Sequence, residues 1–135
     1  MPDELNVQGK TIRLVVGFII DLKEMDGIVY YARPDLKLGA GFGTALAIQA
    51  GPKVQEELKN IGSASVTDVV VTGGGNLQTR CILHAVGPQF QEEDTEGKLR
   101  ATTLNALRKA EERELRRIAL PAMGSGFYGI PLDTC

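Results

Sequence analysis

Two glycine-rich segments contain the residues of this sequence best suited to chemistry. Residues 38–45 carry glycines at positions 39, 41 and 43, and residues 124–129 carry three more around Ser125. Because glycine has no Cβ atom, it lets the backbone turn several N–H groups toward one anion. A loop that runs into a helix adds the positive end of the helix dipole. Either segment alone is equally well explained as a turn that needs glycine for its backbone angles, but together they predict one diphosphate held between them.

Other chemistries find less support in the sequence. No lysine follows the glycines of residues 38–45, which argues against a P-loop that binds a nucleoside triphosphate with magnesium. His84 is the only histidine, and it has no second histidine or cysteine at ligand spacing, so we predict no metal site. Since its segment, CILHAV, has the composition of an apolar strand, we expect His84 to be a buried structural residue. We expect no separate cofactor.

Alternating strands and helices must position the two glycine-rich segments. Runs of β-branched and apolar residues predict strands at residues 11–16, 27–31, 66–72, 80–86 and 118–120. Helical patterns are found at residues 44–50, 52–61 and 98–114. Thr44 is expected to cap the first helix, and Pro52 suits the first turn of the second. Residues 1–10 have the composition of a polar, loosely held lead-in to one domain of residues 11–135.

Strands that alternate with helices predict a sheet covered on both faces. The glycines at positions 73–75 favour a hairpin between two of the strands, so the sheet is expected to be mixed. In α/β folds, ligands bind beyond the carboxyl ends of the strands. Both glycine-rich segments follow strands, and the sequence therefore predicts one site built from two loops.

The overall composition narrows the class of protein and of partner. With 135 residues, 43% of them hydrophobic and 24% charged, the chain fits one soluble domain. No apolar run approaches the roughly 20 residues that span a membrane, and the N-terminus does not resemble a secretion signal. Two cysteines are too few for a disulfide framework, so we expect a cytoplasmic location, or a nuclear one in a eukaryote. A net charge of −2 argues against sequence-specific nucleic-acid binding.

Several motifs in the same order resemble the signature of macrodomains. They are ILHAVGP at 82–88, IALPA at 118–122, the run 124–131, and the segments 36–47, 51–58 and 72–77. This similarity covers residues 12–135 and implies a three-layer α/β/α macrodomain-like fold with a mixed central sheet. The family pattern continues after residue 135 with a helix, a strand and a helix, so we expect the fold to lack that C-terminal segment. A sheet edge left unpaired in this way is prone to association.

The resemblance also implies a ligand and a set of contacts. Macrodomains bind ADP-ribose, and some hydrolyse ADP-ribosyl esters or related metabolites. The expected ligand is therefore ADP-ribose or a related nucleotide, free or attached to a protein. The implied site lies along the two loops and around the adenine. In the second loop, Ser125 can offer a hydroxyl, and the resemblance places Tyr128 near the distal ribose. The residues implied are Phe18, Ile19, Gly39, Ala40, Gly41, Phe42, Gly124, Ser125, Gly126, Phe127 and Tyr128.

Two places depart from the family pattern. Phe18 replaces the acidic residue that usually bonds the adenine amino group, and its ring offers stacking worth roughly 1–3 kcal/mol instead. The usual Asn-Ala-Ala-Asn run is Tyr30-Tyr31-Ala32-Arg33 in this sequence. Arg33 cannot act as a base near neutral pH, but it can pair with a phosphate or carboxylate of the ligand, or it is simply a solvated residue. We expect Tyr30 and Tyr31 to be ordinary strand aromatics on opposite faces of the sheet.

Three functions remain open from the sequence. A binding module for ADP-ribose needs only backbone N–H groups, which tolerate changes of side chain. A hydrolase of ADP-ribosyl groups needs a polar group that orients water, and the asparagine that resembles one is missing. A scaffold for protein contacts needs neither. Binding is favoured over hydrolysis, and hydrolysis over a scaffold.

Overall fold

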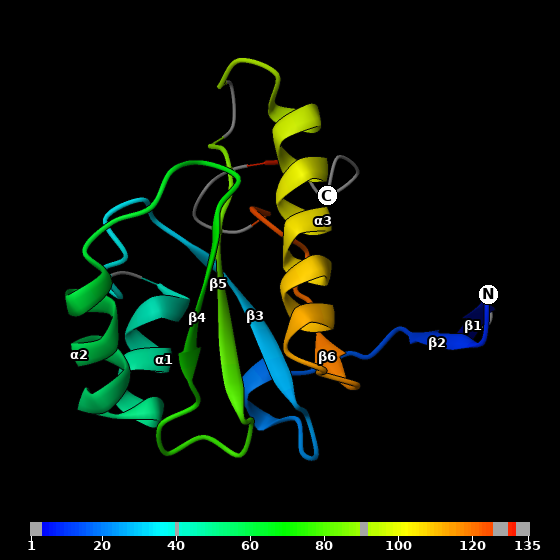
Figure 1. Cartoon of the computed structure of the whole chain (residues 1–135), viewed down its shortest axis with the longest axis horizontal. Helices are drawn as coiled ribbons and strands as arrows, with labels where there is room; N and C mark the ends of the chain where they lie inside the picture. The colour runs from blue at the N-terminus through cyan, green and yellow to red at the C-terminus, as the bar shows by residue number, and fades with distance from the viewer. Residues whose placement is uncertain (1–3, 40, 90–91, 126–129, 132–135) are drawn as a thin grey trace.

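The computed structural model describes residues 4–39, 41–89, 92–125 and 130–131 (Figure 1). Its elements in chain order are β1 (Glu4–Val7), β2 (Lys10–Arg13), the short 3-10 helix η1 (Ile19–Asp21), β3 (Gly27–Ala32), α1 (Phe42–Ala50), α2 (Pro52–Ile61), β4 (Val69–Gly73), β5 (Cys81–Val86), α3 (Thr95–Glu112) and β6 (Ile118–Ala119). Within these residues, no helix is long and apolar enough to cross a membrane.

The main sheet is mixed, as the sequence predicts. Its strand order is β4-β5-β3-β6. β3 runs parallel to both β5 and β6, and β4 pairs antiparallel with β5. The hairpin expected around the glycines at 73–75 therefore forms between β4 and β5. Because β3, β5 and β6 run in the same direction, the loops that follow β3 and β6 both start at the end of the sheet where the carboxyl ends of these strands lie.

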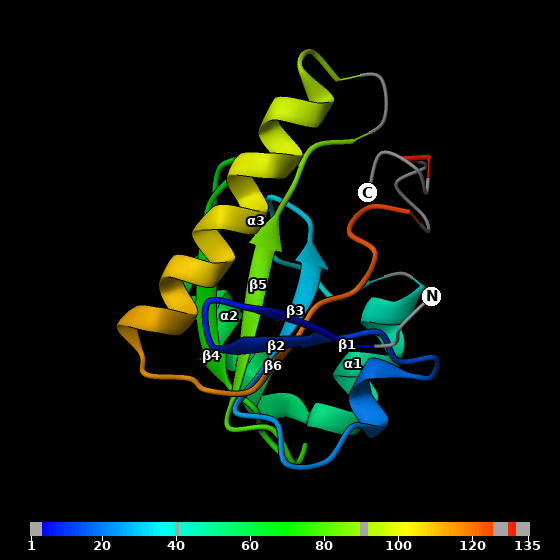
Figure 2. The same ribbon diagram turned by 90° about the vertical axis from the view of Figure 1, so that its right-hand side faces the viewer.

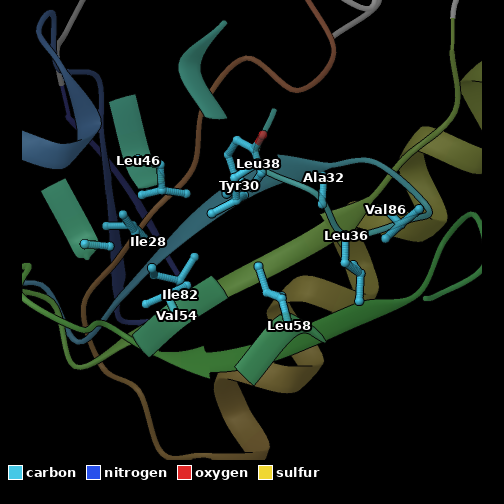
Figure 3. Close-up of a cluster of buried hydrophobic side chains, with 11 residues drawn as sticks. Ile28, Tyr30, Ala32, Leu36, Leu38, Leu46, Val54, Leu58, Ile82 and Val86 are labelled. Atoms are coloured by element: carbon cyan, nitrogen blue, oxygen red, sulfur yellow. The ribbon is translucent and has the colours of Figure 1, made fainter. Parts of the chain in front are cut away.

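Helices cover both faces of this sheet (Figure 1). Alternate residues of β3 supply the two cores: Ile28, Tyr30 and Ala32 pack under α1 and α2, and Val29 and Tyr31 face α3. Figure 3 shows the first of these cores, between β3, β5 and the helices α1 and α2. Every residue of β3 is buried, as is typical of an inner parallel strand. The arrangement is the three-layer α/β/α architecture expected from the sequence.

The N-terminal strands form a separate ribbon. β1 and β2 pair antiparallel around a turn in which Gln8 and Gly9 adopt positive φ values of 50° and 81°, as in a type I′ hairpin. Every residue of both strands is exposed. The ribbon projects from the body of the molecule (Figure 1) and lies in front of the sheet when seen from the side of β6 (Figure 2).

The structure adds to one expectation about this region and corrects another. Residues 4–10, expected as a polar, loosely held lead-in, build β1 and the start of β2. Residues 14–16 are not part of a strand, because β2 ends at Arg13. Apolar, β-branched side chains predict strand propensity, but a strand forms only where a neighbour offers hydrogen bonds. In the described part of the chain, no neighbouring strand reaches residues 14–16.

Candidate functional site

The first glycine-rich loop ends at the N-terminus of α1. Gly41 is the residue that precedes this helix, and its φ of 56° lies in the left-handed region that favours glycine. Thr44 is therefore not the cap that the sequence predicted: it lies inside the first turn, where its N–H donates to the Gly41 carbonyl over 3.1 Å. The sequence signal was misleading because threonine is common both at caps and inside helices that begin earlier.

Backbone donors of this loop are free to bind an anion. Among the described residues, the N–H groups of Gly39, Gly41 and Phe42 donate no hydrogen bond. All three residues are exposed. The first N–H groups of a helix have no partner within the helix and carry its partial positive charge. The start of α1 therefore presents donors and a favourable field to a phosphate without any basic side chain.

The second glycine-rich loop follows β6. Gly124 is buried, with φ at 82°, and the Ile130 N–H donates to its carbonyl over 3.0 Å, which closes the loop. The Ser125 hydroxyl donates to the Ala122 carbonyl over 2.8 Å. Its proton is therefore used within the protein, and the hydroxyl oxygen is left as an acceptor. The other predicted site residues of the loops, Ala40, Gly126, Phe127 and Tyr128, lie outside the described residues.

A hollow joins the two loops. It has a volume of about 2240 Å³, and Phe18, Ile19, Arg33 and Phe42 line it together with Gly124 and Ser125. It continues beneath the β1–β2 ribbon, so a ligand of nucleotide size would fill only part of it. The chain leaving β6 runs past the carboxyl end of β3 toward the start of α1 (Figure 2). Each of the two loops contributes residues to this hollow, Phe42 and Gly43 from the first and Gly124 and Ser125 from the second.

Aromatic side chains lie on the wall of this hollow. Phe18 is 71% exposed, immediately before η1. Phe42 is partly exposed, and its ring centroid lies 5.9 Å from that of Tyr30. Rings with an open face can stack on a planar base. Phe18 is the more accessible of the two.

Arg33 lies beside the first loop and is paired. Its Nη2 atom is 2.8 Å from Oδ2 of Asp35, and the other oxygen of Asp35 accepts the Lys37 N–H over 3.0 Å. A Cβ atom added to Gly39 would lie 3.8 Å from Nη1 of Arg33, so the guanidinium borders the loop. Asp35 holds the arginine in place and offsets part of its charge. The sequence alone gave no reason to select Asp35, although it stands only two residues after Arg33.

His84 is buried, as expected, on β5. Its side chain is 0% exposed, and Nε2 lies 2.9 Å from Oγ1 of Thr72. Burial lowers the pKa of His84 to about 4, so the imidazole is neutral at pH 7. Within the described residues, Nδ1 has no hydrogen-bond partner. No cluster of three histidine, cysteine or carboxylate side chains suited to a metal occurs in the part of the chain that the structure describes.

This fold and loop arrangement can be compared with known proteins. The Macro domain family model matches residues 32–135. The chain belongs to the macro domain family. The fold and the family expected from the sequence motifs are thereby confirmed.

Solved macrodomains and a named relative support the same assignment. The chain is similar to the Oceanobacillus iheyensis macrodomain with ADP, at 30% identity and a TM-score of 0.87, covering 95% of this chain and 72% of that one. The Trypanosoma brucei macrodomain in complex with ADP-ribose matches at 29% identity and a TM-score of 0.79, over 86% of this chain and 48% of that one. A protein of Enterobacter sp. strain 638 named O-acetyl-ADP-ribose deacetylase is 36% identical over 126 residues, which is 89% of this macrodomain and 69% of the relative.

Proposed function

We propose that this macrodomain binds ADP-ribose, free or attached to a protein, chiefly through the backbone N–H groups at the start of α1, since the Ser125 N–H of the second glycine-rich loop already donates to the Ala122 carbonyl over 3.2 Å. The observation that carries the proposal is that the N–H groups of Gly39, Gly41 and Phe42, at and just before the start of α1, have no acceptor among the described residues. Helix N-termini with free N–H groups are recurrent phosphate sites. The ADP and ADP-ribose in the structures of the two similar macrodomains support this class of ligand.

The lining of the hollow suggests how the rest of such a ligand would be placed. The exposed ring of Phe18 offers a face for the adenine. Arg33 borders the first loop and can contribute a charge-assisted hydrogen bond, at the cost of sharing its guanidinium with Asp35. Of the second loop, Gly124 and Ser125 line the same hollow and would border the ligand. Binding would therefore depend on the diphosphate more than on any one side chain.

Gly39→Glu tests this proposal without straining the backbone, since Gly39 does not need a positive φ and only Arg33 lies near the new Cβ. A carboxylate at this position would repel the diphosphate. We expect ADP-ribose affinity, measured by calorimetry, to fall by at least tenfold, or about 1.4 kcal/mol. Ile48→Glu is the matched control, because Ile48 is an exposed residue later on α1, and it should bind like the wild type.

The choice of ligands sharpens the same experiment. ADP-ribose and ADP should bind more tightly than AMP, and adenosine should bind weakest, since only the first two carry a diphosphate. Equal affinity for all four ligands would contradict a site built on the loop N–H groups. An absence of heat with every ligand would overturn the proposed function.

Hydrolysis of an ADP-ribosyl ester is the second candidate, and the name of the Enterobacter relative favours it. Asp35 is the carboxylate bound to Arg33 beside the first loop, but both of its oxygens already accept hydrogen bonds, from Arg33 and from the Lys37 N–H. It is thus poorly placed to activate water. Incubation with O-acetyl-ADP-ribose, followed by chromatography of the products, tests this activity. Turnover that Gly39→Glu abolishes would establish hydrolysis, and no turnover would leave binding alone.

A further inference from the structure

Consecutive tyrosines on β3 each touch one of the two glycine-rich loops. Tyr30 and Tyr31 are both 7% exposed and point to opposite faces of the sheet. β3 lies between β5 and β6 and is paired on both sides. We propose that Tyr30 and Tyr31 are positioning residues, each of which fixes one anion-binding loop from its own face of the sheet. The inference rests on the proposed function for the purpose of the loops, but its structural part can be tested without a ligand.

Tyr30 supports the first turn of α1. Its ring lies 5.9 Å from the ring of Phe42, the first residue of the helix. A Cβ atom added to Gly43 would overlap the Tyr30 hydroxyl oxygen, well under the 3.0 Å that real Cβ contacts respect. Figure 3 shows Tyr30 next to Leu38, whose backbone also borders Gly43. Position 43 therefore requires glycine because the tyrosine hydroxyl occupies the space of a side chain, and not because of an unusual φ.

Tyr31 supports the second loop. A Cβ atom added to Gly124 would lie 3.2 Å from Cζ of Tyr31, so the ring packs directly against the start of that loop. The Tyr31 hydroxyl donates to the carbonyl of the buried Pro88. The ring also fills the space beside Gly87, where any Cβ would overlap it. Tyr31 thus links the chain that leaves β5 to the loop that follows β6.

Precise placement of the loops matters because, under the proposed function, backbone atoms hold the ligand. A backbone donor cannot search for its acceptor by changing rotamer, so it must be held where the anion will bind. A displacement of about 1 Å at such a site can cost on the order of 100-fold in function. By resting on adjacent residues of one buried strand, the two loops take their separation from a single rigid element.

A double-mutant cycle tests the first contact. Gly43→Ala should push α1 away from Tyr30 and weaken ADP-ribose binding by at least about tenfold. Tyr30→Phe removes the oxygen that the new methyl group meets, so the double variant Tyr30→Phe/Gly43→Ala should recover to within about threefold of Tyr30→Phe alone. Gly73→Ala is the matched control, because Gly73 lies on β4 with only a flexible glutamate side chain near the new Cβ. Wild-type affinity in Gly43→Ala, or no recovery in the double variant, would overturn the role of Tyr30.

Hydrogen exchange of the unliganded protein tests whether Tyr30 and Tyr31 each support only one loop. Tyr30→Phe should speed amide exchange in residues 38–46 and leave residues 120–125 unchanged. Tyr31→Phe, which loses the hydrogen bond to Pro88, should speed amide exchange in residues 120–125 and leave exchange in residues 38–46 unchanged. A purely structural role would instead change both segments together with the melting temperature, and that result would overturn the inference. If the wild type fails to bind ADP-ribose while this loop-specific pattern appears, the proposed ligand is wrong and the positioning role stands.

Discussion

At the scale of single residues, His84 shows how a polar group is accommodated in an apolar sheet. Its imidazole shares a hydrogen bond with Thr72 on β4 through one nitrogen, and its ring centroid lies 6.0 Å from that of Tyr30 in a T-shaped arrangement. Burial alone is the cause of its lowered pKa. The sequence pattern CILHAV was sufficient to predict a buried histidine, because a run of apolar residues on both sides of it is typical of an inner strand. The partner Thr72 was not predictable, since it depends on the register between β4 and β5.

This burial predicts a dependence of stability on pH. The folded pKa of about 4 lies below the ordinary value of 6.5. As the pH falls from 6.5 toward 4, the unfolded chain therefore binds a proton that the folded chain does not. We expect the free energy of unfolding to fall by up to about 3 kcal/mol across this window. Urea unfolding of the wild type and of His84→Gln at several pH values measures the effect.

The comparison with His84→Gln isolates the histidine. The glutamine variant should be less stable at pH 7, because it loses the bond to Thr72, but its stability should change little between pH 6.5 and pH 4.5. Parallel pH profiles for the two proteins would show that His84 does not titrate as its burial requires.

At the scale of elements, Asp26 holds β6 at the edge of the sheet. It precedes β3, and its Oδ2 atom accepts the N–H groups of Arg116 and Arg117 over 2.8 and 3.0 Å. These backbone hydrogen bonds are the main cause of the lowered pKa of Asp26, with smaller contributions from Arg80 and Arg117. Since β6 has only two residues, its pairing with β3 depends on such contacts. β6 in turn leads into the second loop.

We predict that Asp26→Ala loosens β6 and the loop beyond it. Amide exchange of residues 116–120 should speed up, and the melting temperature should fall by a few degrees at pH 7. Because the pKa of Asp26 is lower in the folded protein than its ordinary value of 3.8, the ionised carboxylate stabilises the fold at pH values above 3.8. This stabilisation is lost as the pH falls below 3.8 and the carboxylate takes up a proton. The wild type and the variant should therefore converge in melting temperature near pH 2. A difference that persists at pH 2 would contradict this role.

The helices and strands are the part of the structure that the sequence predicts best. Strands and helices with strong apolar patterns were predicted within a few residues of their observed bounds. The start of α1 at Phe42 was missed, because Gly41 and Gly43 weaken the helical signal. The positive φ explains Gly41, and the fit against Tyr30 explains Gly43. The Arg33–Asp35 pair was missed because it depends on the turn that follows β3. Contacts made by the tertiary structure, and not by local pattern, account for these gaps.

At the scale of the whole molecule, several apolar side chains are exposed near the β6 edge of the sheet. Within the described residues, β6 pairs with β3 alone. Leu14, Val15 and Val16 are exposed on the chain that follows the β1–β2 ribbon, and Leu120 is exposed just after β6. Leu14, Val15 and Leu120 all line the hollow between the two glycine-rich loops. An open strand edge beside apolar side chains favours association.

We therefore predict that the chain associates as its concentration rises. Sedimentation velocity should show a larger species at about 100 μM than at about 5 μM, following mass action. Leu14→Lys/Val16→Lys should shift the equilibrium toward the monomer, since the two lysines would replace exposed apolar side chains by like charges. Ile48→Lys, an exposed apolar residue on α1, is the control and should associate like the wild type. A monomer at both concentrations would contradict the prediction.

The alternation of Tyr30 and Tyr31 along β3 has a consequence for how this macrodomain can diverge. Neighbouring residues of a strand face opposite sides, so inserting or deleting one residue early in β3 would exchange the two rings. Each loop would then meet the wrong support, even if its own sequence were untouched. Changes in loop length should thus be tolerated far more readily than changes in the length of this strand. New ligand preferences are most accessible to evolution through the loop tips, with the tyrosine dipeptide as a fixed reference point.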